Sequence, residues 1–189
     1  MEGFLISLSA VAIAEIGDKT QLLTLVLAAR FARPLPLIAG IFAATIVNHA
    51  LAAGAGLLIA SWLTPEVLQW TLGISFVAGG VWMLIPDKFD EVSGGASRFG
   101  PFITTTIAFF LAEMGDKTQL ATVGLAARFD DLVIVAAGTT IGMMIANVPV
   151  VFLGDAAAKF LPLQLVRGAA AAIFFALGLV TILEALGVV

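Results

Sequence analysis

The chain of 189 residues is strongly apolar: hydrophobic residues make up 61% of it and charged residues 12%, against roughly 45–50% and 25% in an ordinary soluble domain. A soluble fold could not bury so much apolar surface, so the composition indicates an integral membrane protein whose solvent is the lipid bilayer. The lack of cysteine excludes disulfides and thiolate metal sites, and a net charge of −4 without a basic run gives no reason to expect a nucleic-acid partner.

Six apolar segments are long enough to cross a bilayer, since a spanning helix needs about 20 residues. In chain order, we predict helices at 3–30, 36–61, 66–86, 101–127, 132–154 and 165–186. The first segment is expected to be a helix rather than a signal peptide, because Glu2 stands where a positive region should be. The predicted fold class is therefore an all-α integral membrane protein with six transmembrane helices.

The chain is also an internal duplication. Residues 14–31 align with residues 112–129 without a gap, and fourteen of the eighteen positions are identical. The offset of 98 residues is about half of the chain, which is typical of a duplicated membrane bundle. We predict a first three-helix repeat at 1–86, a linker loop at 87–100 and a second three-helix repeat at 101–189. Because each repeat crosses the membrane three times, the second repeat enters from the opposite side and the two repeats are inverted.

Basic residues are distributed unevenly between the two sides of this arrangement. On one side of the membrane the basic residue is Arg128. The other side consists of the connections after the first, third and fifth helices. These connections and their flanks contain Arg30, Arg33, Lys88, Arg98, Lys159 and Arg167. By the positive-inside rule, we expect the linker in the cytoplasm and both termini outside. The first and fourth helices then run antiparallel, so their equivalent residues can face each other near the midplane.

A polar motif occurs in both of these helices, as AEIGDKTQL from Ala14 and as AEMGDKTQL from Ala112. An ionisable side chain at mid-membrane costs at least ~2.5–3.5 kcal/mol, so such a cluster indicates a functional site. Residues three or four apart share a face of a helix. This spacing predicts one stripe on each helix, and the oxygen-bearing residues of the two stripes are Glu15, Asp18, Gln21, Glu113, Asp116 and Gln119. Such oxygen atoms are hard ligands, suited to Ca²⁺, Mg²⁺ or Mn²⁺.

The charge of the two motifs also suits exchange. Each motif sums to −1 when its Glu and Asp are ionised and its Lys is protonated. One divalent cation neutralises the pair of motifs, and two protons do so equally well. Lys19 and Lys117 are expected to pair with the acids when the site is empty or to extend away from it, so that they serve either proton coupling or orientation of the acids.

Several neighbouring residues have two plausible roles. Asn48 and Asn147 lie at nearly equivalent depths and could add amide oxygens to the site or hold helices together. Gln21 and Gln119 could likewise bind the ion or hydrogen-bond between helices. Gly17 and Gly115 are expected to permit a local unwinding that frees backbone carbonyls. Thr20 and Thr118 are expected to hydrogen-bond to their own helix. Asp155 and Glu184 are expected to be solvated.

The doubled Glu-x-Gly-Asp-Lys-Thr, here Glu15 to Thr20 and Glu113 to Thr118, resembles the signature of the GDT family of cation/proton exchangers. The resemblance extends over essentially the whole chain. It implies six spans with a central charged loop and transport of Ca²⁺ or Mn²⁺ against protons. It also implies that the metal is bound by Glu15, Asp18, Glu113 and Asp116, and that acids of the same set exchange protons.

The combined interpretation is a multi-pass protein of the inner (plasma) membrane that exports Mn²⁺, with Ca²⁺ as a second candidate, in exchange for protons. It is not expected to be an enzyme and needs no cofactor beyond the transported ion; a homo-oligomer is left open. The first alternative is an exporter of a small organic cation such as a basic amino acid. An intramembrane hydrolase with paired acids is a second alternative, and a structural scaffold held by internal ion pairs is a third.

Overall fold

The computed structural model describes residues 1–85, 99–153 and 163–188, and within these ranges the chain is helical apart from short connections. Most of the predicted linker lies outside the described residues, as do Lys88, Arg98, Asp155 and Lys159. The helices are α1 (Glu2–Glu15), α2 (Lys19–Phe31), α3 (Pro34–Trp62), α4 (Pro65–Met83), α5 (Pro101–Glu113), α6 (Lys117–Phe129), α7 (Leu132–Leu153) and α9 (Leu163–Ala185).

An all-helical membrane protein is confirmed. Among the described residues, three helices are long and apolar enough to span a bilayer, namely α3, α7 and α9. The segments predicted at 3–30 and 101–127 are each divided into two helices of 13 or 14 residues, at the motif glycines where a local unwinding was expected. The other predicted boundaries agree with the structure to within about three residues.

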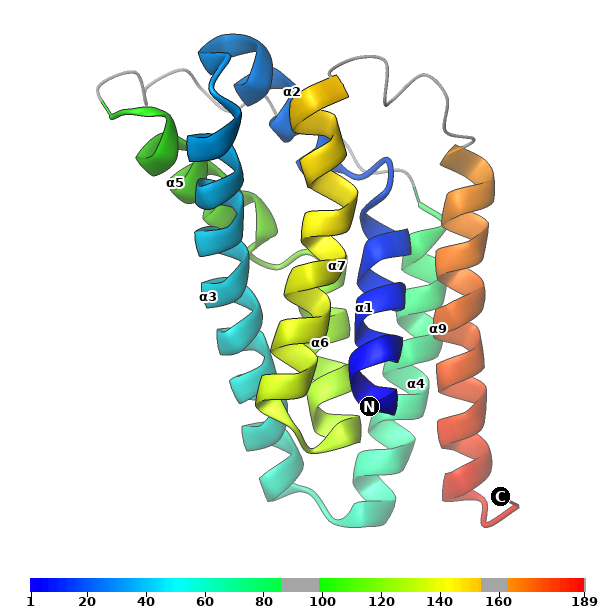
Figure 1. The fold of residues 1–189 in the computed structure, drawn as a ribbon. Coiled ribbons are helices and arrows are strands. Elements are labelled where there is room, and N and C mark those ends of the chain that lie inside the picture. The colour runs from blue at the N-terminus through cyan, green and yellow to red at the C-terminus, as the bar shows by residue number, and fades with distance from the viewer. Residues whose placement is uncertain (86–98, 154–162, 189) are drawn as a thin grey trace.

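The helices form one elongated bundle (Figure 1). Both termini lie at the same end of the bundle, together with the connections between α3 and α4 and between α6 and α7. We call this the terminus end. The connection between α2 and α3 lies at the opposite end, where α2 and α5 are also found.

One helix crossing occurs twice in the bundle. A β-carbon on Gly40 of α3 would lie 2.8 Å from the carbonyl oxygen of Phe102 in α5, and one on Gly138 of α7 would lie 2.7 Å from that of Phe4 in α1. Both pairs of equivalent residues are 98 positions apart, as in the duplicated motif. Small residues let helix backbones approach this closely in membranes. Each half of the chain thus packs its first helix against the long helix of the other half.

The remaining helices pack unequally on the two halves. α4 and α9 pack closely against each other, and this pair packs against α6 and α1. In the described part of the chain, the equivalent contacts of α9 with α2 and of α4 with α5 are at most marginal. The buried core is accordingly divided: one cluster includes Phe76, Leu125 and Phe174, and a second includes Leu27 and Phe109.

Candidate functional site

The duplicated motif forms the same chain break in both halves. α1 ends at Glu15, Ile16 is extended, and Gly17 has a φ of 80° before α2 begins. In the second copy α5 ends at Glu113, and Gly115 has a φ of 74°. Glycine adopts this left-handed conformation without the steric cost that a β-carbon brings. The local unwinding expected at the two glycines is therefore confirmed.

The glutamine of each motif hydrogen-bonds to the backbone at the break in its own helix. The backbone N–H of Gly17 donates to Oε1 of Gln21 at 2.8 Å, and that of Gly115 donates to Oε1 of Gln119 at 2.7 Å. Their amide nitrogens donate to other helices: Gln21 to the carbonyl oxygen of Ala146 at 2.8 Å and Gln119 to Oδ1 of Asn48 at 2.6 Å. Both glutamines thus have the interhelical hydrogen-bonding role, which was one of the two expected.

Three carboxylates of the motifs meet inside the bundle. Glu15 and Glu113 are fully buried and Asp116 is 3% exposed. One oxygen of each lies within 4.8 Å of the others. They do not meet along a helical stripe, as the spacing predicted, because the helices are broken. Glu15 and Glu113 lie at the carboxyl ends of α1 and α5, and Asp116 lies at the N-cap of α6.

This placement favours a cation. The carboxyl end of a helix carries a partial negative charge of about half an elementary charge. Two such ends therefore add to the charge of the three carboxylates. Helix breaks in transporters bring carbonyl-bearing helix ends to a cation in the same way. Burial of like charges this close costs several kcal/mol per ion unless an opposite charge compensates them, so the cluster requires a bound cation, protons or a basic side chain.

Hydroxyl groups orient the two glutamates. Thr20 Oγ1 donates to Glu15 Oε2 at 2.5 Å, and Thr118 Oγ1 donates to Glu113 Oε2 at 3.1 Å. The expectation that these threonines bond to their own helix backbone is wrong: the break turns them toward the carboxylates. Oε1 of both glutamates is buried and has no hydrogen-bond partner among the described residues. Each glutamate therefore has one oxygen that accepts a hydrogen bond and a second, buried oxygen that could bind a ligand.

The two motif lysines have different partners. Lys19 Nζ lies 2.8 Å from Asp116 Oδ1, which makes an ion pair between the two halves of the chain. Lys117 Nζ instead donates to the carbonyl oxygen of Ile85 at 2.9 Å. Asp18 is buried but does not belong to the group of three carboxylates; it lines a very small cavity that Lys117 and Arg167 also line.

Both predicted asparagines are buried beside the motif helices. Nδ2 of Asn48 donates to the carbonyl oxygen of Phe110 at 3.1 Å. Oδ1 of Asn147 accepts from Thr24 at 2.8 Å. The amide oxygens of both side chains are engaged by residues of α6 and α2, respectively, so in this conformation the asparagines connect helices.

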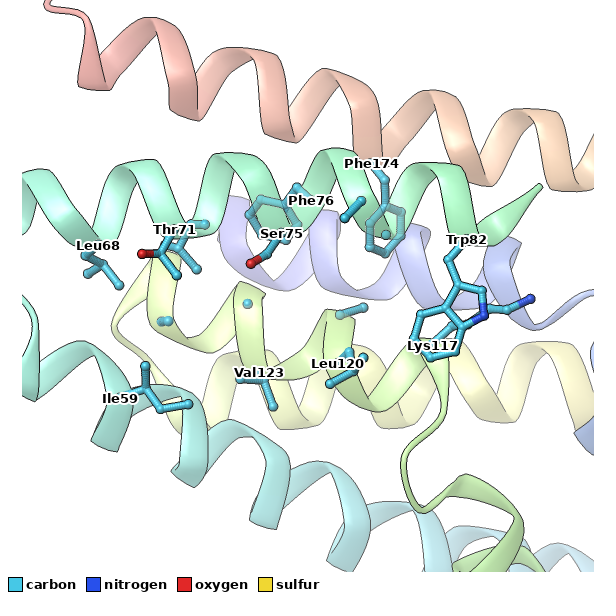
Figure 2. A pocket seen from close by; sticks show the side chains of 16 residues that line it. Ile59, Leu68, Thr71, Ser75, Phe76, Trp82, Lys117, Leu120, Val123 and Phe174 are labelled. Carbon is cyan, nitrogen blue, oxygen red and sulfur yellow. The ribbon is translucent and has the colours of Figure 1, made fainter. Parts of the chain in front are cut away.

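A larger cavity of about 340 Å³ lies along α6, between α3 and α4, and its walls are mostly apolar. Figure 2 shows Leu68 near one end of this cavity, with Lys117 and Trp82 at the other. None of the three clustered carboxylates lines it. The cavity therefore adjoins the second motif without forming part of the carboxylate site.

Comparison with known proteins identifies a family and several relatives of this chain. The sequence model of the divalent cation/proton antiporter GDT1 family matches residues 3–91 and 101–188. A Vibrio cholerae protein named "Putative manganese exporter" is 51% identical over 177 residues, which covers 93% of this chain and 88% of the relative. GDT1-like protein 5 of Arabidopsis thaliana is 32% identical over 183 residues, covering 73% of this chain and 77% of the relative. No solved structure matches the chain.

These matches define the class of protein as a multi-pass membrane transporter of cations. The chain belongs to the divalent cation/proton antiporter GDT1 family. The two matched stretches each contain one copy of the motif, and together they leave out little of the chain besides part of the central linker.

Proposed function

We propose that this protein exports Mn²⁺ from the cytoplasm in exchange for protons, by alternating access to the carboxylate site. The observation that carries the proposal is the meeting of Glu15, Glu113 and Asp116, buried and within 4.8 Å of one another. The ligands of the ion would be these three carboxylates with Asp18. The amide oxygens of Gln21, Gln119, Asn48 and Asn147 would join only after rearranging from their present hydrogen bonds.

Exchange follows from competition for the same oxygens. A divalent cation needs the carboxylates deprotonated, so its affinity falls as the pH falls. Protons that enter from outside would bind the glutamates and weaken their hold on the cation. Release of those protons into the cytoplasm would restore the empty, negatively charged site for the next cation.

Lys19 gives the empty site a compensating charge. Its amine lies 2.8 Å from Asp116, where it occupies a position that a cation would also favour. Binding of Mn²⁺ would displace the amine, and departure of the metal would bring it back. Lys19 therefore serves proton-coupled turnover by preventing the carboxylates from standing unpaired.

For the membrane topology, we propose six crossings in two inverted repeats. α1 with α2 would form the first crossing and α5 with α6 the fourth, each broken at the site. The repeated crossing of Gly40 and Gly138 with the opposite half supports this arrangement. The charge bias would place the terminus end outside the cell and the linker in the cytoplasm, in the inner membrane.

Manganese is favoured as the exported ion by the name of the Vibrio cholerae relative and by the oxygen-only ligand set. Ca²⁺ has the same ligand preference and is the second candidate. Export of a small organic cation such as a basic amino acid is the alternative. It is less favoured because none of the clustered carboxylates lines the cavity of about 340 Å³ described above.

The test is flux into proteoliposomes with an imposed pH gradient. We expect the intact protein to move Mn²⁺ only when a gradient is present, and the variant Asp116→Asn to move none. Arginine and lysine serve as competing organic cations in the same assay. Gradient-driven movement of lysine without movement of Mn²⁺ or Ca²⁺ would replace the proposal with its alternative.

A further inference from the structure

An ion pair joins α6 to α9 far from the carboxylate site. The guanidinium of Arg128 makes two hydrogen bonds of 3.0 Å, one to each carboxylate oxygen of Glu184. It also donates to the hydroxyl of Thr181. The side chains of Arg128 and Glu184 are 17% and 33% exposed, so the expectation that Glu184 is simply solvated is wrong. A bidentate ion pair of this kind is geometrically specific as well as stabilising.

The pair lies at the end of α6, next to open space. A cavity of about 420 Å³ adjoins Arg128, Thr181 and Glu184. The 340 Å³ cavity of Figure 2 shares the lining residues Leu68, Leu72 and Ala127 with it. Space therefore extends along the α4 side of α6, from Lys117 of the second motif to Arg128. The ion pair holds the end of α6 beside this space.

The first half of the chain has no equivalent of this pair among the described residues. Arg30 stands 98 positions before Arg128, at the end of α2. It is exposed, and its guanidinium lies 5.5 Å from the ring centre of Phe31. α2 also lacks the packing against α9 that α6 has against α4. Within the described ranges, the ion pair thus occurs at one end of the duplicated structure and not at the other.

We propose that the Arg128–Glu184 ion pair is a gate that holds the terminus end of the transport path closed in this conformation. The inference rests on the proposed alternating access, and Arg128 and Glu184 act as positioning residues rather than ligands. α6 begins at the second motif and ends at Arg128, so its movement couples the carboxylate site to this end. When the pair breaks, α6 can shift into the adjoining cavities and open the terminus end.

A thiol reporter tests the gate directly, because the chain has no cysteine. Ala127 is 5% exposed and lines both cavities, so Ala127→Cys should be poorly reached in the closed state. The measurement is the rate of labelling by membrane-impermeant methanethiosulfonates applied from the terminus side. Using one anionic and one cationic reagent separates true opening from a local change of charge.

We expect Arg128→Ala and Glu184→Gln, each combined with Ala127→Cys, to be labelled at the cysteine about fivefold faster with both reagents. A change of this size is what loss of a partly exposed ion pair can produce. The charge swap Arg128→Glu with Glu184→Arg should return the rate toward that of the parent. The matched control Arg30→Ala should leave the rate unchanged. Glu184→Gln preserves the shape of the side chain, so it decides the matter even if Arg128→Ala does not fold.

Unchanged labelling in Glu184→Gln would overturn the gate, as would a charge swap that labels as fast as the single variants. The labelling rate does not depend on which ion is transported. If the intact protein moves no Mn²⁺ but the labelling rates change as predicted, the proposed cargo alone would therefore be rejected. Normal flux with unaltered labelling would reject the gate alone.

Discussion

The two copies of the motif have the same backbone and different partners. In both, a glutamate ends a helix, a left-handed glycine turns the chain, and a glutamine closes the turn. Beyond the turn the copies diverge: Lys19 pairs with Asp116 of the other half, whereas Lys117 bonds to the backbone of Ile85. Local sequence therefore decides the turn, and tertiary neighbours decide the partner of each lysine.

The same asymmetry runs through the bundle. α4 and α9 pack against α1 and α6, but hardly against α2 and α5. In the inverted-repeat topology that we propose, exchanging the roles of the two halves would produce a conformation that faces the other side of the membrane. The structure can thus be understood as one of two related states. The differences between the motifs are then properties of that state rather than of the residues themselves.

The largest expected effect comes from neutralising one clustered glutamate. We expect Glu113→Gln to raise the Kd for Mn²⁺ by about 100-fold, since removing one charge from a buried set costs about 2–5 kcal/mol. Glu15→Gln should be equally harmful, because the two glutamates are equivalent in burial and position. Isothermal titration calorimetry of the detergent-solubilised protein measures both. Unequal losses would mean that the ion is held by one motif at a time.

The two motif lysines should differ in their effect on Mn²⁺ affinity. Lys19→Met removes the amine beside Asp116, so we expect Mn²⁺ to bind about tenfold more tightly, or ~1.4 kcal/mol, and to exchange more slowly. Lys117→Met should change the affinity much less, because the amine of Lys117 donates to the carbonyl oxygen of Ile85. Binding and flux assays on both variants measure the difference. Weaker binding after Lys19→Met would show that the amine organises the site instead of competing for it.

A smaller effect is expected at the turn. Gly115 has a φ of 74° and nothing lies within 4 Å of where a β-carbon would stand. Gly115→Ala should therefore cost only the backbone strain of the left-handed conformation, about 1–2 kcal/mol of stability. Gly168, which is helical and equally open, is the matched control, and Gly168→Ala should be neutral or stabilising by up to about 1 kcal/mol. Thermal unfolding in detergent compares them; equal melting temperatures would contradict the strain account.

The sequence was sufficient to predict the features that depend on local pattern. Apolar run lengths predicted most helix boundaries, and the repeated glycine predicted the two breaks. The convergence of acids from two distant segments also followed from the duplication. The mode of convergence did not, because a stripe of acids along each helix was expected and the carboxylates meet at helix ends instead.

The unpredicted features all depend on tertiary neighbours. Thr20 and Thr118 reach the glutamates only because the chain turns between them. Their fixed place, five residues after each glutamate in both copies, was the available signal. The pairing of Arg128 with Glu184 joins residues 56 positions apart, and neither the repeat nor helical periodicity relates them.

The central claim is that the buried carboxylates bind the cation and the protons in turn. It is tested most directly by counting the protons released when Mn²⁺ binds to the purified protein in weakly buffered solution, over a range of pH. The account predicts that protons leave as the metal binds, that the Kd for Mn²⁺ rises as the pH falls, and that Glu113→Gln reduces the proton release along with the binding. Tight Mn²⁺ binding with no proton release at any pH would contradict it.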